Sequence, residues 1–330
     1  MPKRILVAGG AGFIGSHLCE HLIERGDAVV CVDDLSTGSP SNLVGLDGSD
    51  RFSFVEADVC APLSGQVSGD GIGVLDEVFD VIVHLASAAS PPAYLARPLE
   101  TLDVGSTGTR LLLERARRDG ARFVLASTSE VYGDPQVHPQ HEGYWGNVNP
   151  IGERSVYDEA KRFAEALTMA CHRSLDVDVG IVRIFNTYGP RLAPDDGRAV
   201  SNFISQALRG EPLTIYGDGT QTRSFCYVDD LVAGLIAMID ADVVGPVNLG
   251  NPNEFTLAEL ADRVVAATGV RTGVVHLPLP SDDPKVRRPD ISRARDLLGW
   301  SPQVELAEGL ELTVAWIRGE LGDGESAHLH

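Results

Sequence analysis

The chain has 330 residues with a formal net charge of −20 at pH 7 and a pI near 4.7. This length can bury one large two-lobed core or two domains, and the negative charge argues against nucleic acid or anionic membranes as partners. The five scattered cysteines form no Cys-x-x-Cys pair and indicate reduced thiols in a cytoplasmic protein. The first strand pattern starts almost at residue 1, so we expect neither a signal peptide nor a membrane anchor.

The amino-terminal stretch KRILVAGGAGFIGSHL has the pattern of a dinucleotide-binding turn. A short apolar run leads into Gly9, Gly12 and Gly15, and a helical pattern follows. Gly9 permits a tight turn, Gly12 lets the backbone approach a pyrophosphate, and Gly15 allows close packing of helix on strand. The glycine spacing alone is weak, but its place between a strand and a helix is the context that such a site requires. We expect Phe13 and Ile14 to complete this part of the cofactor site.

The next apolar run, DAVVCVDD, ends in Asp33, close to the offset of about 20 residues at which a carboxylate binds a ribose diol. Asp33 and Asp34 would repel a 2′-phosphate, and the next basic residue is Arg51, so we expect NAD rather than NADP. A solvated turn residue is the alternative interpretation of Asp33. Later strand ends supply three further candidate cofactor residues, which are Asp58, Val59 and Leu85.

Strand and helix patterns alternate over the first half of the chain, which predicts an α/β fold with a Rossmann-type doubly wound parallel sheet. The predicted strands are ILVAG, AVVCVD, FSFVEA, VIVHLA, FVLAST and VGIVRIF, and two predicted helices cover about 98–119 and 155–175. We expect an NAD-binding domain over 1–187, with a return of the chain at about 225–250. Glycine and proline break the pattern after that domain, which indicates a smaller carboxyl-terminal α/β substrate lobe over 188–330.

Four residues indicate proton-transfer chemistry. Tyr157 and Lys161, in SVYDEAKR, are one helical turn apart and leave the same face, so the ammonium can lower the pKa of the phenol. An exposed helical pair is the alternative, because Tyr-x-x-x-Lys is common by chance. Thr128 and Glu130 follow the apolar run RFVLAST, at the carboxyl end of a strand, where open α/β sheets bind ligands.

These motifs resemble the extended short-chain dehydrogenase/reductase family and, within it, the UDP-glucuronate decarboxylases, or UDP-xylose synthases. The resemblance extends from Lys3 to about Leu310, and Ala88 and Ala160 replace a proline and a glycine that are usual in the family. Its most specific stretches include HLASAASPP, ASTSEVYGDP, EGYWGNVNPIG, YDEAKR, RIFNTYGPR, TQTRSFCYVDDL and DDPKVRRPD.

The resemblance implies an NAD-dependent decarboxylation of UDP-glucuronate to UDP-xylose. Tyr157, beside Lys161, would take the proton of the C4 hydroxyl, which Thr128 would orient, while a hydride passes from C4 to NAD⁺. The 4-keto acid is a β-keto acid and can lose CO₂. Protonation at C5 and return of the hydride would then give the pentose.

Two residues distinguish this activity from related ones. In the dehydratases an Asp directly precedes the residue that matches Glu130, and here Ser129 occupies that position, so their acid is missing. Simple 4-epimerases commonly lack the Glu. Arg287 matches the decarboxylase arginine, and its guanidinium group suits the substrate carboxylate. Without the resemblance, Arg287 would be interpreted as a solvated charge in a loop. Arg288 lies next to it and complicates the assignment.

The resemblance also implies a UDP-sugar pocket, in which Arg223 would be the main counter-charge for the diphosphate. The other candidate substrate residues are Pro91, Tyr94, Asn186, Arg191, Arg198, Asn202 and Tyr216. No metal site is expected, because His17 and His21 do not form a His-Glu-x-x-His motif.

Two other classes of function stay open. One is a different sugar-nucleotide enzyme, either a 4-epimerase or a decarboxylase that releases the 4-keto pentose, since all use the same base and hydride acceptor. The other is a non-catalytic NAD-sensing scaffold, which would be expected to lose Tyr157, Lys161 or Glu130. Relatives also imply a homodimer whose four-helix seam pairs the two predicted helices. Its candidate residues are Leu102, Leu111, Leu112, Phe163, Leu167 and Ala170.

Overall fold

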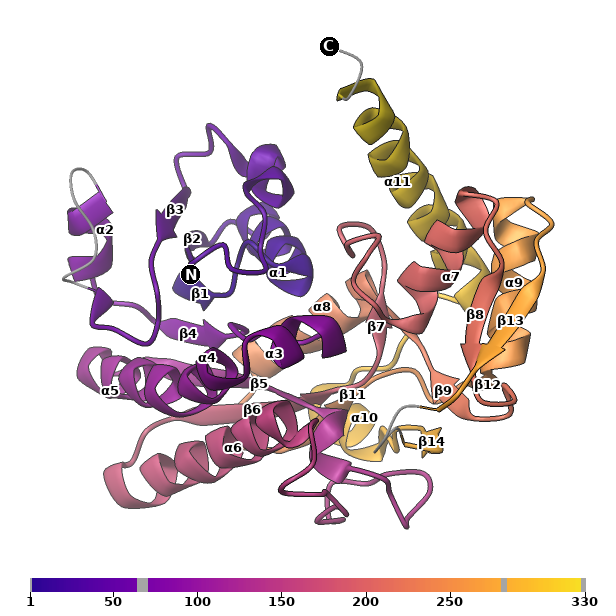
Figure 1. The fold of residues 1–330 in the computed structure, drawn as a ribbon. Coiled ribbons are helices and arrows are strands. Elements are labelled where there is room, and N and C mark those ends of the chain that lie inside the picture. Colours follow the sequence, from indigo (N-terminus) through magenta and orange to yellow (C-terminus); the bar gives the residue numbers. More distant parts are fainter. Residues whose placement is uncertain (1, 64–70, 280–283, 328–330) are drawn as a thin grey trace.

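A computed structural model describes residues 2–63, 71–279 and 284–327, and a seven-stranded parallel sheet lies at its centre (Figure 1). Its strands are β1 (Arg4–Ala8), β2 (Ala28–Asp33), β3 (Phe52–Glu56), β4 (Val81–His84), β5 (Arg122–Thr128), β6 (Val179–Ile184) and β11 (Val247–Leu249). They pair in the order β11-β6-β5-β4-β1-β2-β3, and each neighbouring pair is parallel. The six predicted strands and the doubly wound sheet are therefore confirmed.

Helices cover both faces of this sheet because its strands are apolar on both sides. Ile5 and Val7 of β1 pack in one core cluster with α1 (Phe13–Glu24) and α8 (Val228–Asp240). Leu6, between them, packs in a second cluster with α5 (Thr109–Asp119) and α6 (Ser155–Leu175). Two shorter helices, α2 (Gly71–Asp76) and α3 (Pro91–Ala96), follow β3 and β4.

The helix expected over 98–119 is one continuous coil with a wider turn in its middle. It consists of α4 (Pro98–Asp103), a π-helical turn η3 (Val104–Gly108) and α5. Gly105 faces α6 so closely that a Cβ atom there would lie 2.7 Å from the Cβ of Ala160. Figure 1 shows α4, α5 and α6 side by side on one face of the sheet.

The second lobe packs beside the carboxyl ends of the strands, on the right in Figure 1. One parallel pair consists of β8 (Leu213–Tyr216) and β13 (Val274–Leu277). A three-stranded sheet has the order β12 (Glu254–Thr256), β9 (Thr222–Ser224) and β14 (Val286–Arg287). A second parallel pair consists of β10 (Cys226–Tyr227) and β7 (Thr187–Tyr188). The helices of this lobe are α7 (Ala199–Leu208), α9 (Leu257–Thr268), α10 (Ser292–Leu298) and α11 (Leu306–Ala327).

One hydrophobic cluster continues from the large sheet into this lobe, because Val182 of β6 belongs to the same cluster as Phe203 of α7 and Leu260 of α9. The strand β11, at the edge of the large sheet, also comes from the second half of the chain. Over the described ranges, every helix is too short or too polar to span a bilayer.

Candidate active site

A cavity of about 760 Å³ lies at the carboxyl ends of the parallel strands, against the second lobe. The strand order reverses between β1 and β4, which is where open α/β sheets bind their ligands. All the site residues expected from the sequence line this cavity. They are Gly9, Gly12, Phe13, Ile14, Gly15, Asp33, Asp58, Val59, Leu85, Pro91, Tyr94, Thr128, Glu130, Tyr157, Lys161, Asn186, Arg191, Arg198, Asn202, Tyr216, Arg223 and Arg287.

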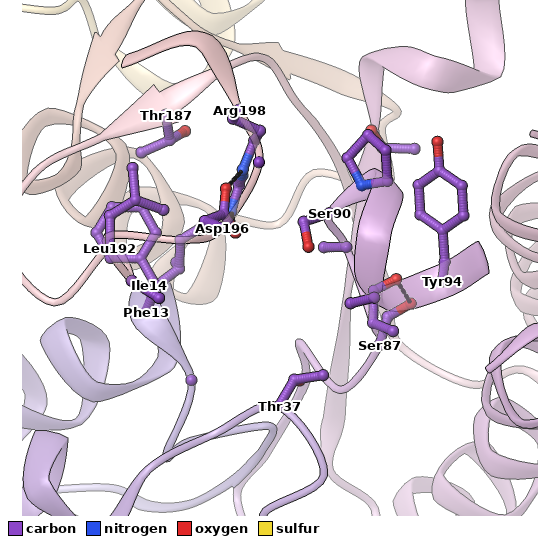
Figure 2. A pocket seen from close by; sticks show the side chains of 18 of the residues that line it. Phe13, Ile14, Thr37, Ser87, Ser90, Tyr94, Thr187, Leu192, Asp196 and Arg198 are labelled. Atoms are coloured by element: carbon purple, nitrogen blue, oxygen red, sulfur yellow. Dashed lines mark hydrogen bonds and ion pairs between the residues drawn. The ribbon is translucent and has the colours of Figure 1, made fainter. Parts of the chain in front are cut away.

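The glycine-rich turn has the conformation that its sequence predicts. Gly9 has φ +82°, and a Cβ atom there would lie 2.5 Å from the backbone nitrogen of Ala86. A Cβ atom at Gly15 would lie 2.1 Å from the carbonyl oxygen of Gly9. Helix α1 begins at Phe13 without a capping side chain, and Figure 2 shows Phe13 and Ile14 together at the wall of the pocket. A helix start of this kind suits the pyrophosphate of a dinucleotide.

Asp33 lies at the end of β2 and is fixed by the backbone. Its carboxylate accepts hydrogen bonds from the backbone N–H of Ala11 (3.0 Å) and of Leu35 (2.9 Å). Burial raises the pKa of Asp33, although these hydrogen bonds act in the opposite direction. Asp34 beside it is exposed. A carboxylate held at this edge of the cavity fits the ribose diol of NAD.

Tyr157 and Lys161 are both almost completely buried on α6. The Nζ atom of Lys161 donates a hydrogen bond to the carbonyl oxygen of Ala126 (3.0 Å), and burial lowers the pKa of this lysine to about 8. The ring of Tyr157 stacks on the ring of Tyr94, with centroids 5.2 Å apart and an interplanar angle of 6°.

The expected lowering of the phenol pKa by the lysine is wrong for the protein alone. Burial raises the pKa of Tyr157 to about 12, although its hydrogen bond with the Thr128 side chain acts in the opposite direction. The physical reason is desolvation, which disfavours the charged form of both residues. Lys161, 5.9 Å from the centroid of the Tyr157 ring, is hydrogen-bonded to the backbone instead.

Glu130 lies between two guanidinium groups. It follows β5 in the 3₁₀ helix η4 (Ser129–Tyr132), and its carboxylate is 2.5 Å from Nη1 of Arg287 and 2.7 Å from Nη2 of Arg154. Burial alone would raise the pKa of Glu130, but the two arginines outweigh it and lower the pKa to about 2. The buried Nη2 atom of Arg287 has no hydrogen-bond partner among the described residues, so it can receive a further anionic group.

Arg154 was missed by the sequence analysis, although its position contains a signal. It is the N-cap residue of α6, where a cation is unfavourable because the helix dipole makes this end positive. A basic residue there therefore needs another partner, and the structure supplies Glu130.

The candidate residues for the nucleotide part of the substrate line the cavity from the second half of the chain. Arg198 forms an ion pair with Asp196, visible in Figure 2 opposite Ser90 and Tyr94. Arg191 forms an ion pair with Glu20 (2.7 Å), and the side chain of Asn202 donates to the carbonyl oxygen of Gly197 (3.1 Å). Arg223 donates to the carbonyl oxygen of Thr222 (2.8 Å), and Tyr216 is partly exposed. The cavity thus brings five arginines together in an acidic protein, which are Arg154, Arg191, Arg198, Arg223 and Arg287.

Comparisons with known proteins agree with this geometry. Residues 5–250 match the NAD dependent epimerase/dehydratase family. UDP-glucuronic acid decarboxylase 1 of Arabidopsis thaliana is 52% identical over 318 residues, which are 96% of this chain and 70% of that protein. UDP-glucuronic acid decarboxylase 1 of Danio rerio is 49% identical over 319 residues, which are 97% of this chain and 73% of that protein.

Solved structures share the whole fold. The UDP-glucose 4-epimerase of Thermotoga maritima, solved with UDP-glucose, has a TM-score of 0.86 and 31% identity, over 96% of this chain and 99% of that one. The UDP-glucuronic acid 4-epimerase of Bacillus cereus, solved with UDP-glucuronic acid and NAD, has a TM-score of 0.84 and 30% identity, over the same shares of 96% and 99%. The chain belongs to the NAD dependent epimerase/dehydratase family, and its similarity to UDP-glucuronic acid decarboxylases confirms the resemblance that its motifs predicted.

Proposed function

We propose that this chain is an NAD-dependent decarboxylase that converts UDP-glucuronate to UDP-xylose through a 4-keto intermediate. The observation that carries the proposal is the cluster of Glu130 with Arg287 and Arg154, in the same cavity as the buried Tyr157. It provides a cationic place for the sugar carboxylate and an ionisable group next to it. The identity of about 50% with UDP-glucuronic acid decarboxylases supports the same substrate.

The cofactor site fits NAD. Gly9 and Gly15 lie where a side chain would collide with backbone, and Asp33 is fixed at the end of β2. The glycine turn and the start of α1 would hold the pyrophosphate, and Asp33 would hold the ribose diol. When bound there, NAD⁺ would supply a reversible hydride acceptor for C4 of the sugar, so it would not be consumed.

The first proton transfer belongs to Tyr157. Its phenol would remove the proton of the C4 hydroxyl while Thr128 hydrogen-bonds the same oxygen. Because burial raises the pKa of Tyr157 to about 12 in the protein alone, the phenolate needs additional positive charge nearby. Lys161 and the positively charged nicotinamide ring are the groups that would supply it.

Loss of CO₂ follows from the ketone at C4, because the carboxylate is then β to a carbonyl that accepts the electron pair. The free Nη2 atom of Arg287 would bind that carboxylate and fix its orientation before the C5–carboxyl bond breaks. C5 then takes a proton, and Tyr157 returns its proton to the C4 oxygen as the ketone is reduced. The sum is one proton consumed and one CO₂ released.

A single incubation tests the proposal against its alternatives. The purified protein is mixed with UDP-glucuronate and NAD⁺, and the products are resolved by mass spectrometry and NMR. UDP-xylose with CO₂ is the expected result. UDP-galacturonate would instead indicate a 4-epimerase, a class represented among similar structures. Release of the 4-keto pentose with NADH would indicate a decarboxylase without the final reduction.

The proposal includes a homodimer in the cytoplasm, with an NAD-binding domain over 1–187 and 225–250 and a substrate lobe over the rest. The expected seam on α4 and α6 is supported by exposed apolar side chains, which are Leu99 (71%), Leu102 (37%) and Phe163 (52%). Leu112 does not belong to this seam, because it is 1% exposed and packs in the core under the sheet.

A further inference from the structure

A second cavity of about 300 Å³ approaches the Glu130 cluster from the protein surface. Its outer part is lined by the exposed residues Asp134, Asn147 and Asn149, and its inner part by Arg154 and the buried Asp158. Arg154 also lines the large cavity. Arg154, which forms an ion pair with Glu130, therefore borders both spaces.

Asp158 is a buried acid to which the mechanism above assigns no role. It is 6% exposed, and its Oδ1 atom has no hydrogen-bond partner among the described residues. The hydroxyl of Tyr94, on a side chain that is 1% exposed, is unpartnered in the same way. Among the described residues, the charged and titratable groups that act on Asp158 come from η4, α3, α6 and β14, and they are Glu130, Arg154, Arg287, Glu159, Tyr157 and Tyr94.

Asp158 differs from Glu130 in its protonation. Burial and the charge of Glu130 raise the pKa of Asp158 to about 7, although Arg154 and Arg287 act in the opposite direction. The pKa of Glu130 is about 2, so its carboxylate is ionised at neutral pH. Of these two neighbouring acids, Asp158 is therefore the one whose protonated form is populated near neutral pH.

The proposed reaction needs such a proton. Tyr157 gives back to the C4 oxygen the proton that it removed, so the proton that replaces the carboxyl group at C5 must come from elsewhere. Glu130 cannot bring it while both arginines keep it ionised. The UDP-sugar itself occupies the large cavity, so solvent needs a separate approach to the reacting carbon.

We propose that the second cavity is the proton inlet of the decarboxylase and that Asp158 is the acid that relays solvent protons to C5. The inference rests on the proposed function. The O–H bond of Asp158 breaks, and its proton moves through water past Arg154 to the C5 carbanion, where a C–H bond forms. The Asp158 carboxylate then takes its next proton from solvent in the cavity. The unpartnered hydroxyl of Tyr94 adds a hydrogen-bonding group beside this route.

Asp158→Asn tests the relay, with Glu159→Gln as the matched control on the next residue of α6. Glu159 is half-buried and pairs with Arg162. In a single turnover with UDP-glucuronate, both variants should form bound NADH at the wild-type rate. The later disappearance of NADH should slow by about 10²-fold in Asp158→Asn alone, the lower end of the range for a positioned proton donor. The wild-type kcat should fall as pH rises above about 7, because a relay acid must be protonated to donate. The kcat of Asp158→Asn should not show this fall.

Two outcomes would overturn the relay. One is a kcat of Asp158→Asn that falls above pH 7 as the wild-type kcat does. The other is equal slowing of NADH formation and NADH disappearance in Asp158→Asn, which a structural defect would cause. If Asp158→Asn does not fold, the pH dependence of the wild-type kcat tests the relay instead. A wild-type kcat that does not fall above about pH 7 would contradict the relay. Production of CO₂ by wild type establishes the decarboxylase separately, so failure of the relay leaves the proposed function intact.

Discussion

Glu130 and Arg287 form a 2.5 Å ion pair although 157 residues separate them in the chain. Glu130 belongs to the short turn after β5, and Arg287 to β14, a strand of two residues beside β9. The pair therefore connects the large sheet to the second lobe across the cavity. Because both side chains are largely buried, each depends on the other for charge compensation.

Glu130→Gln should separate chemistry from binding. The amide keeps the shape of the side chain but removes its charge, so the variant should bind NAD and UDP-glucuronate nearly as wild type does. Its kcat should fall by about 10²–10⁴, the range for a positioned proton-transfer group. Binding is measured by calorimetry and turnover by CO₂ release. A variant with nearly full CO₂ release would leave Glu130 with a structural role only.

Arg287→Lys should weaken recognition of the sugar carboxylate. Lysine has a single nitrogen and cannot bind Glu130 through one nitrogen and the sugar carboxylate through another, so the loss should be specific to the acid sugar and on the order of 10-fold in Kd or more. UDP-glucose is the control ligand, since it has the same nucleotide without the carboxylate. Equal weakening of UDP-glucose and UDP-glucuronate binding would show that Arg287 acts on the fold of the pocket rather than on the carboxylate.

The contribution of Glu130 to the free energy of unfolding should depend on pH. Its pKa is lowered from 4.5 to about 2 in the folded protein. The resulting stabilisation is complete above pH 4.5 and is lost as pH falls toward 2. At neutral pH, Glu130→Gln should lower the free energy of unfolding by about 3 kcal/mol, as for a broken buried ion pair. In denaturation experiments, the difference from wild type should shrink below pH 4.5, and a constant difference would contradict the ion-pair origin.

The sequence predicts the parts of the site that depend on local patterns. The glycine turn at Gly9–Gly15 connects β1 to α1, Asp33 ends β2, and Tyr157 and Lys161 lie one turn apart on α6. Their periodicity and spacing fix where the side chains point. All of them line one cavity in the structure.

The parts that the sequence did not predict depend on contacts between distant segments. No periodic pattern indicates that β14 pairs with β9 or that Arg287 reaches Glu130. The high pKa of Tyr157 was missed for the same reason, because its burial, which includes the stacking of Tyr94 from α3 on its ring, arises only in the folded chain. A local argument from Lys161 could not include that desolvation.

Tyr157→Phe should stop the reaction before any carbon bond breaks. Phenylalanine keeps the stacking with Tyr94 but cannot take the C4 proton, so no bound NADH absorbance should appear when UDP-glucuronate is added. The contrast with Glu130→Gln is the useful measurement, since that variant should still form NADH. NADH formation by Tyr157→Phe at more than about 1% of the wild-type rate would mean that another group acts as the base.

Phe163→Glu should separate the proposed homodimer into monomers. Phe163 is 52% exposed on α6, which packs against α4, and a two-fold seam would bury the introduced charge twice. Leu312→Glu is the matched control, because Leu312 is 46% exposed on α11, outside the proposed seam. Light scattering at micromolar concentration should give twice the 35.2 kDa chain mass for wild type and Leu312→Glu, and one chain mass for Phe163→Glu. A monomeric wild type would refute the dimer, and a dimeric Phe163→Glu would place its interface elsewhere on the surface.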